Sequence, residues 1–142
     1  MKKFNKLTLS LILFFIFHTN TILAQEVSDA WMRKPHPTLR MAAIYLKIKN
    51  TLNKDITLIN VTGEDAEKFE IHTHKNINGV MKMRKLDKLL IPAQKTIHLK
   101  PMGDHIMVFN FKKEKIESSQ TQIGLEFNEG IKTQVQVLIK ED

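Results

Sequence analysis

Short runs of alternating apolar and polar residues follow one another about every ten residues from Trp31 onward, and turn-forming residues separate them. Val, Ile and Thr are frequent in these runs, as they are in β-strands. The predicted strands are Met41–Lys49, Ile56–Val61, Phe69–Lys75, Val80–Leu86, Thr96–Lys100, His105–Phe111, Gln122–Phe127 and Ile131–Ile139. A single helical turn is expected at Asp65–Phe69. The pattern predicts an all-β protein, a sandwich or barrel in one domain.

The first 24 residues follow a different pattern. Lys2, Lys3 and Lys6 precede an apolar run, Leu7–Phe17, and Ala24 supplies a small residue at a cleavage point. This is the layout of a secretory signal peptide, with an apolar run too short for a membrane span. We therefore expect residues 1–24 to be cleaved and 25–142 to form an exported domain without stable membrane insertion. An uncleaved anchor is the alternative.

The charge of the chain changes once this segment is set aside. The 142 residues have a net charge of +7, but three lysines belong to the predicted signal peptide. The remainder has 19 Lys and Arg against 15 Asp and Glu, a net charge of +4. These lysines are scattered, and no arginine cluster alternates with aromatic residues as single-strand nucleic-acid binding requires. We expect no nucleic-acid partner.

The chain contains no cysteine. This excludes disulfides, thiolate zinc sites, iron–sulfur clusters, blue-copper sites and cysteine nucleophiles. Soft-metal binding is then left to methionine and histidine. Beyond residue 24 the chain has six Met and five His, and several of them share strand positions.

Two His/Met pairs fall on the predicted hairpin around Asn76–Gly79. If Lys75 pairs with Val80, His72 lies opposite Met83 and His74 lies opposite Met81. All four side chains then share one face, because positions two apart in a strand point the same way. Directly paired Cβ atoms lie about 4.5–5.5 Å apart, close enough for an imidazole and a thioether to share a metal. A bulge of one residue would shift this register.

A third His/Met pair occurs at His105 and Met107, which lie on one face of a later strand with Ile106 on the other. If that strand lies beside the hairpin, His72, Met83, His105 and Met107 can converge. Two imidazoles and two thioethers favour Cu(I) over zinc, calcium or magnesium. Taken singly, such a Met more often fills a core and such a His more often lies at the surface. Repeated pairing on one face is poor core design, because each buried imidazole needs a partner.

The spacing His72-x10-Met83-x21-His105-x-Met107 resembles the copper-binding motif of the PCuAC family of copper chaperones. The resemblance extends over essentially all of residues 25–142, and further stretches carry it: Asp29–Arg33, Ala42–Leu46 with Asn50, Gly79–Arg84, Ile91–Ala93 and Pro101–Met107. It implies a cupredoxin-like Greek-key β-sandwich or barrel with a surface Cu(I) site. The implied ligands are His72, Met83, His105 and Met107, either all four at once or with one replaced by a neighbour such as Met81. His74 with Met81 forms a candidate secondary metal pair beside them.

The same resemblance implies a periplasmic protein of a Gram-negative type of envelope that is not an enzyme. Its implied role is delivery of copper to the dinuclear copper centre of cytochrome c oxidase, alongside a thioredoxin-like copper protein. Two alternatives stay open: copper buffering or resistance, and an envelope β-sandwich that binds other proteins without metal. An enzyme is the weakest hypothesis, because no Ser/His/Asp order or nucleophile elbow stands out.

Overall fold

The computed structural model describes residues 25–141, and this part of the chain forms strands joined by short loops. The strands are β1 Gln25–Arg33, β2 Ala42–Asn50, β3 Ile56–Gly63, β4 Ala66–Ile77, β5 Val80–Leu86, β6 Leu89–Ile91, β7 Thr96–Leu99, β8 His105–Phe111, β9 Gln120–Phe127 and β10 Lys132–Lys140. Two 3₁₀-helices complete the set, η1 Lys113–Lys115 and η2 Asn128–Gly130. The prediction of an all-β protein is confirmed. The predicted signal peptide, residues 1–24, lies outside the described residues.

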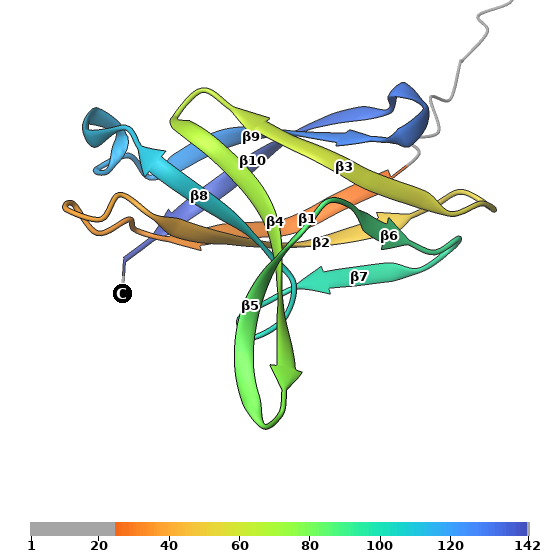
Figure 1. The fold of residues 1–142 in the computed structure, drawn as a ribbon. Helices are drawn as coiled ribbons and strands as arrows, with labels where there is room; N and C mark the ends of the chain where they lie inside the picture. The colour runs from red at the N-terminus through yellow and green to blue at the C-terminus, as the bar shows by residue number, and fades with distance from the viewer. Residues whose placement is uncertain (1–24, 142) are drawn as a thin grey trace, which may run out of the picture.

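The strands form one continuous sheet in the order β5-β4-β8-β2-β1-β10-β9-β3-β6, with β7 paired to β2. β1 joins the two halves, because it pairs antiparallel with β2 and parallel with β10. Its register shifts between Ser28 and Trp31, where Asp29 has a φ of 53°. Such a bulge increases the local twist of a strand. Figure 1 shows the sheet folded over on itself, with the β4–β5 hairpin extending from one side.

The hydrophobic core lies between the two layers of this folded sheet. It is built from alternate residues of the strands, among them Ile44 and Ile48 of β2, Ile106 of β8 and Leu125 of β9, all with no exposed surface. Burying such a side chain contributes about 1.5–3 kcal/mol. Because successive strand residues point to opposite faces, burial of one set directs the residues between them to the outer surface. No helix among residues 25–141 is long and apolar enough to cross a membrane.

Three details differ from the sequence predictions. β1 and β6 were not predicted, and the helical turn expected at Asp65–Phe69 is wrong, because β4 already begins at Ala66. β4 pairs with β8 from Ala66 to His72, and this pairing keeps the segment extended.

The predicted register of the hairpin is also wrong. Ile77 pairs with Val80, so the turn contains only Asn78 and Gly79, both with positive φ, at 53° and 81°. Two positive-φ residues form the type I′ turn that matches the twist of a hairpin, and Asn-Gly is its preferred sequence.

The hairpin register differs from the predicted one by two residues. This changes which residues pair across the two strands, but not the face of the sheet on which each side chain lies. His74 lies opposite Met83, His72 lies opposite Lys85, and Met81 lies opposite Asn76. The predicted cross-strand pairs His72–Met83 and His74–Met81 therefore do not form. All four side chains stay on one face, because the side-chain period of a strand is two.

Candidate metal centre

Two imidazoles lie directly opposite each other on the outer face of the sheet. β4 and β8 run antiparallel, and His72 of β4 pairs with His105 of β8. The neighbouring pair, Ile71 and Ile106, points the other way into the core, where 4% and 0% of their surfaces are exposed. Core packing therefore places both histidines outward. Met107 shares this face, since it lies two residues beyond His105.

Met83 reaches the same place from β5, the edge strand beyond β4. Its Sδ lies 3.2 Å from Nε2 of His105. Met83 is 42% exposed, whereas Met107, His105 and His72 are 9% or less exposed. The cluster is therefore closed on the sheet side and open to solvent at one thioether.

A third histidine is closer to this cluster than the sequence suggested. The ring centroids of His74 and His105 lie 5.1 Å apart, and those of His72 and His105 lie 5.9 Å apart. Among residues 25–141, no three side chains of the His, Cys, Asp and Glu types are placed to hold a metal ion together. The candidate centre is instead a mixed set of imidazoles and thioethers.

The orientation of His105 is set by a backbone carbonyl. Its Nδ1 lies 2.9 Å from the carbonyl oxygen of Gly103, and Nδ1 of His74 lies 3.4 Å from the same oxygen. A carbonyl only accepts, so Nδ1 of His105 donates its proton to it, and in the neutral ring Nε2 then carries a lone pair. This lone pair faces the sulfur of Met83.

The loop before β8 holds this carbonyl in place. The backbone N–H of Lys100 donates to the carbonyl of Asp104 at 2.8 Å, and the N–H of Gly103 donates to the carbonyl of Lys100 at 3.0 Å. Met102 lies in the same turn with a φ of 63° and is 66% exposed.

The surroundings of His105 favour its neutral form. Burial lowers the pKa of His105, and the charges of the neighbouring His74 and His72 lower this pKa further, against the hydrogen bond to Gly103. Neutral imidazole is the form that binds metals. The lowered pKa of His105 therefore favours the form of the ring that binds a metal.

Aromatic rings pack beside the two paired histidines. The ring of Tyr45 lies 6.4 Å from that of His105, and Trp31 packs on Tyr45 at 4.8 Å between centroids. Phe109 lies 6.2 Å from His72. These rings limit the freedom of both imidazoles.

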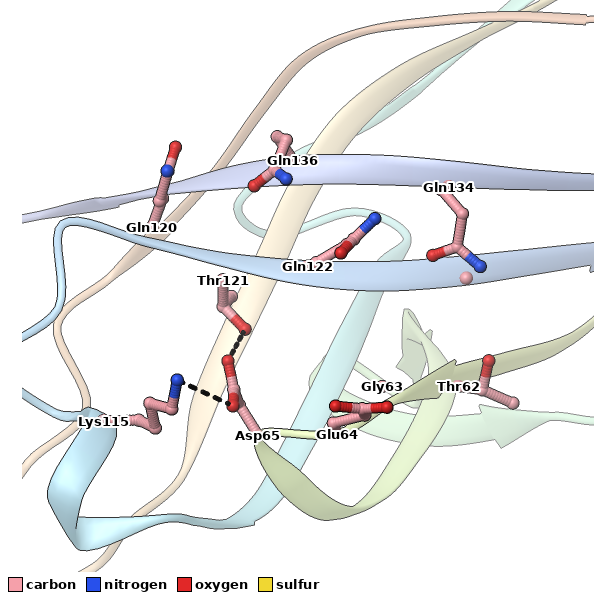
Figure 2. Close-up of a pocket in the computed structure, with 11 residues that line it drawn as sticks. Thr62, Gly63, Glu64, Asp65, Lys115, Gln120, Thr121, Gln122, Gln134 and Gln136 are labelled. Carbon is pink, nitrogen blue, oxygen red and sulfur yellow. Dashed lines mark hydrogen bonds and ion pairs between the residues drawn. The ribbon is translucent and has the colours of Figure 1, made fainter.

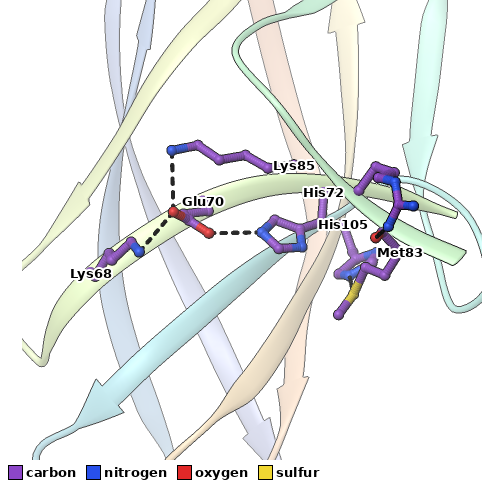
Figure 3. Close-up of polar contacts among 7 residues, drawn as sticks. Lys68, Glu70, His72, Met83, Lys85 and His105 are labelled. Carbon is purple, nitrogen blue, oxygen red and sulfur yellow. Dashed lines mark hydrogen bonds and ion pairs between the residues drawn. The ribbon is translucent and has the colours of Figure 1, made fainter.

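A carboxylate lies on the far side of His72. Oε2 of Glu70 lies 2.9 Å from Nε2 of His72, while Lys68 and Lys85 pair with Oε1 at 2.8 and 3.2 Å. These hydrogen bonds, led by the one from Lys68, lower the pKa of Glu70 to about 2. Figure 3 shows the His72 ring between Glu70 on one side and His105 with Met83 on the other.

The structure gathers the four predicted ligand residues on one face, and their role as ligands stays a prediction. It does not bring Met81 opposite His74. Sequence reasoning did not identify Glu70 or the Gly103 carbonyl. The position of Glu70, two residues before His72, was an available signal, because it places both side chains on one face.

A polar hollow elsewhere on the sandwich contains none of these residues. It has a volume of about 650 Å³, and its lining includes four glutamines of β9 and β10 together with Asp65 and Lys115. Thr121 donates a hydrogen bond to Asp65 at 2.8 Å, and Lys115 pairs with the same carboxylate at 3.7 Å (Figure 2).

The fold and the outer face together define a β-sandwich protein with a candidate imidazole–thioether metal centre. The family model described as "Putative lipoprotein LpqE-like" matches residues 26–139. The chain belongs to the LpqE-like family.

Two curated relatives match by sequence. The chain is 28% identical over 117 residues to "Putative lipoprotein Lxx21020" of Leifsonia xyli subsp. xyli, covering 82% of this chain and 69% of that protein. It is 31% identical over 102 residues to "Uncharacterized protein RP573" of Rickettsia prowazekii, covering 71% of this chain and 56% of that protein. The chain therefore spans little more than half of the second relative.

Solved structures of PCuAC domains share the fold. A copper-bound PCuAC domain from PmoF2 has a TM-score of 0.70 at 16% identity, covering 84% of this chain and 94% of that domain. Apo-DR1885 from Deinococcus radiodurans has a TM-score of 0.62 at 25% identity, covering 86% of this chain and 82% of that one. The Cu(I) form of DR1885 has a TM-score of 0.62 at 23% identity, covering 84% and 78%. The fold expected from the PCuAC resemblance is confirmed.

The ion cluster around Glu70 predicts an acid-dependent loss of stability. The folded pKa of about 2 lies below the ordinary value of 4.5, so the unfolded chain binds this proton first as the pH falls. Glu70 makes its full contribution to the free energy of unfolding when the pH is above its pKa in the unfolded chain. This contribution is lost as the pH falls toward its pKa in the folded protein.

Urea unfolding at pH values between the folded and the unfolded pKa of Glu70 measures this effect. The free energy of unfolding of the wild type should fall more steeply with acidification than that of Glu70→Gln, which has no carboxyl group to titrate. Parallel curves for the two proteins would contradict the assignment.

Proposed function

We propose that this protein is a copper chaperone that binds one Cu(I) ion as cargo through His72, Met83, His105 and Met107. The observation that carries the proposal is the 3.2 Å approach of the His105 Nε2 lone pair to the Met83 sulfur. Imidazole nitrogen with thioether sulfur is a donor set that suits Cu(I). Copper-bound forms of two PCuAC proteins with this fold add support.

The spacing of these two donor atoms is close to what a metal requires. With zinc-like bonds of about 2.0 Å to nitrogen and about 2.3 Å to sulfur, tetrahedral donors lie about 3.5 Å apart. The donors in the structure lie 3.2 Å apart, so a movement of a few tenths of an ångström admits the ion. This pair of donor atoms is therefore largely preorganised.

The uneven exposure of the ligands favours transfer over storage. Three of the proposed ligands are at most 9% exposed, whereas Met83 is 42% exposed on an edge strand. An incoming ligand can attack the metal from the Met83 side while the buried imidazoles still hold it. Copper then leaves by stepwise ligand exchange, with no catalysis by the protein.

The proposal also includes the compartment in which the protein acts and the protein that receives its copper. The export signal expected at residues 1–24 directs the protein to the periplasm, and the PCuAC resemblance favours the dinuclear copper centre of cytochrome c oxidase as acceptor. A thioredoxin-like copper protein is a proposed second partner in the same transfer.

Substitution of single ligands tests the site. Met83→Ala and His105→Ala should each weaken Cu(I) binding by more than about tenfold, or about 1.4 kcal/mol, because each removes one donor. Titration of the mature protein against a chromophoric Cu(I) chelator measures the affinity.

Two variants serve as matched controls. Met81→Ala removes an equally exposed thioether from the same strand, and His98→Ala removes an exposed imidazole from β7. Both should bind nearly as the wild type does. Wild-type affinity in Met83→Ala and His105→Ala would contradict the site, and a wild-type protein whose melting temperature copper does not raise would contradict copper binding altogether.

Deletion of the gene tests delivery. Cells lacking the protein should lose cytochrome oxidase activity at low copper, and added copper or the wild-type gene should restore it, whereas the His105→Ala gene should not. Oxidase activity and copper content of the membranes are the measurements. Unchanged oxidase activity together with increased copper sensitivity would indicate buffering instead.

A further inference from the structure

The two nitrogens of His72 have very different surroundings. Nε2 lies 2.9 Å from the Glu70 carboxylate, while Nδ1 is buried and has no hydrogen-bond partner among the described residues. A buried polar atom without a partner costs free energy, so such an atom calls for an explanation. A metal ion bound through the Nδ1 lone pair would satisfy this atom.

Glu70 is itself held firmly in place. Both lysine contacts, from Lys68 and Lys85, fall on Oε1, which leaves Oε2 to face His72. The side chain of Glu70 is only 11% exposed, and β8 pairs with β4 at this point, with Met107 opposite Glu70. The carboxylate therefore has one oxygen anchored and the other directed at the ring (Figure 3).

We propose that Glu70 is a positioning residue that accepts the Nε2 proton of His72, so that His72 binds copper through Nδ1. A carboxylate only accepts, so the shared proton resides on Nε2 and the lone pair resides on Nδ1. A metal-binding histidine whose other nitrogen donates to a carboxylate is held in one tautomer and one ring orientation. The inference rests on the proposed binding of Cu(I).

His72 and His105 then donate a proton from different ring nitrogens. His105 donates from Nδ1 to the Gly103 carbonyl and offers Nε2, whereas His72 donates from Nε2 to Glu70 and offers Nδ1. Each imidazole has one nitrogen occupied by the protein and one left for the metal. The centre thus has two different donor atoms on two facing strands.

The apo protein gives the first test, and it needs no copper. Long-range ¹H–¹⁵N NMR spectra at about pH 8, above the ordinary pKa of free histidine, report which ring nitrogen carries the proton. His72 should be protonated at Nε2 in the wild type, and Glu70→Ala should lose this preference. A wild-type His72 protonated at Nδ1 would overturn the proposal.

Cu(I) binding gives the second test. Glu70→Ala should weaken the affinity by about 10- to 100-fold, the usual effect of removing a group that orients a metal ligand. Glu70→Gln should recover most of the loss, because its amide oxygen can still accept from Nε2. Glu67→Ala, at an exposed position of the same strand bonded to Asn110, is the control and should bind as the wild type does.

The spectrum of the loaded protein separates this inference from the proposed function. On Cu(I) addition the ¹⁵N resonance that shifts should be Nδ1 in His72 and Nε2 in His105. Binding that shifts Nε2 of His72, or a Glu70→Ala variant of wild-type affinity and native fold, would overturn the positioning role alone. A wild type that binds no Cu(I) would overturn the proposed function and this inference with it.

Discussion

The pairing of β4 with β8 is the constraint on which the candidate centre depends. Ile71 and Ile106 form a buried cross-strand pair, and the adjacent pair, His72 and His105, must then face outward. A slip of one residue would expose the isoleucines and bury the imidazoles, at a cost in hydrophobic burial that strongly disfavours it. Packing of the core, not attraction between the histidines, brings the two rings together.

Strand periodicity alone was enough to predict which face carries the histidines and methionines, but not which residues pair. The prediction placed a four-residue turn at Asn76–Gly79, whereas the hairpin turns at Asn78 and Gly79 alone. The Asn-Gly pair, which favours a two-residue turn, was the available signal. The predicted face of the histidines and methionines is nevertheless correct, because the hairpin register differs from the predicted one by two residues. β1 was harder to predict, because a bulge at Asp29 interrupts its alternation.

The groups that orient the imidazoles could be predicted least. The carbonyl of Gly103 has no side-chain signature, and it meets His105 only because a tight turn at Lys100–Asp104 precedes β8. Glu70 was visible as a same-face neighbour of His72, but its anchoring by Lys85 depends on the true hairpin register. These contacts come from the loop conformation and from pairing between distant strands. They explain how a surface site can hold its ligands in place while one thioether stays exposed.

X-ray absorption at the copper edge, on the mature protein loaded with one equivalent of Cu(I), tests the central claim most directly. The proposed centre predicts a mixed first shell of imidazole nitrogen and thioether sulfur, and a loss of sulfur scattering in Met83→Ala. A shell of nitrogen and oxygen alone, or a spectrum unchanged by Met83→Ala, would contradict the imidazole–thioether centre.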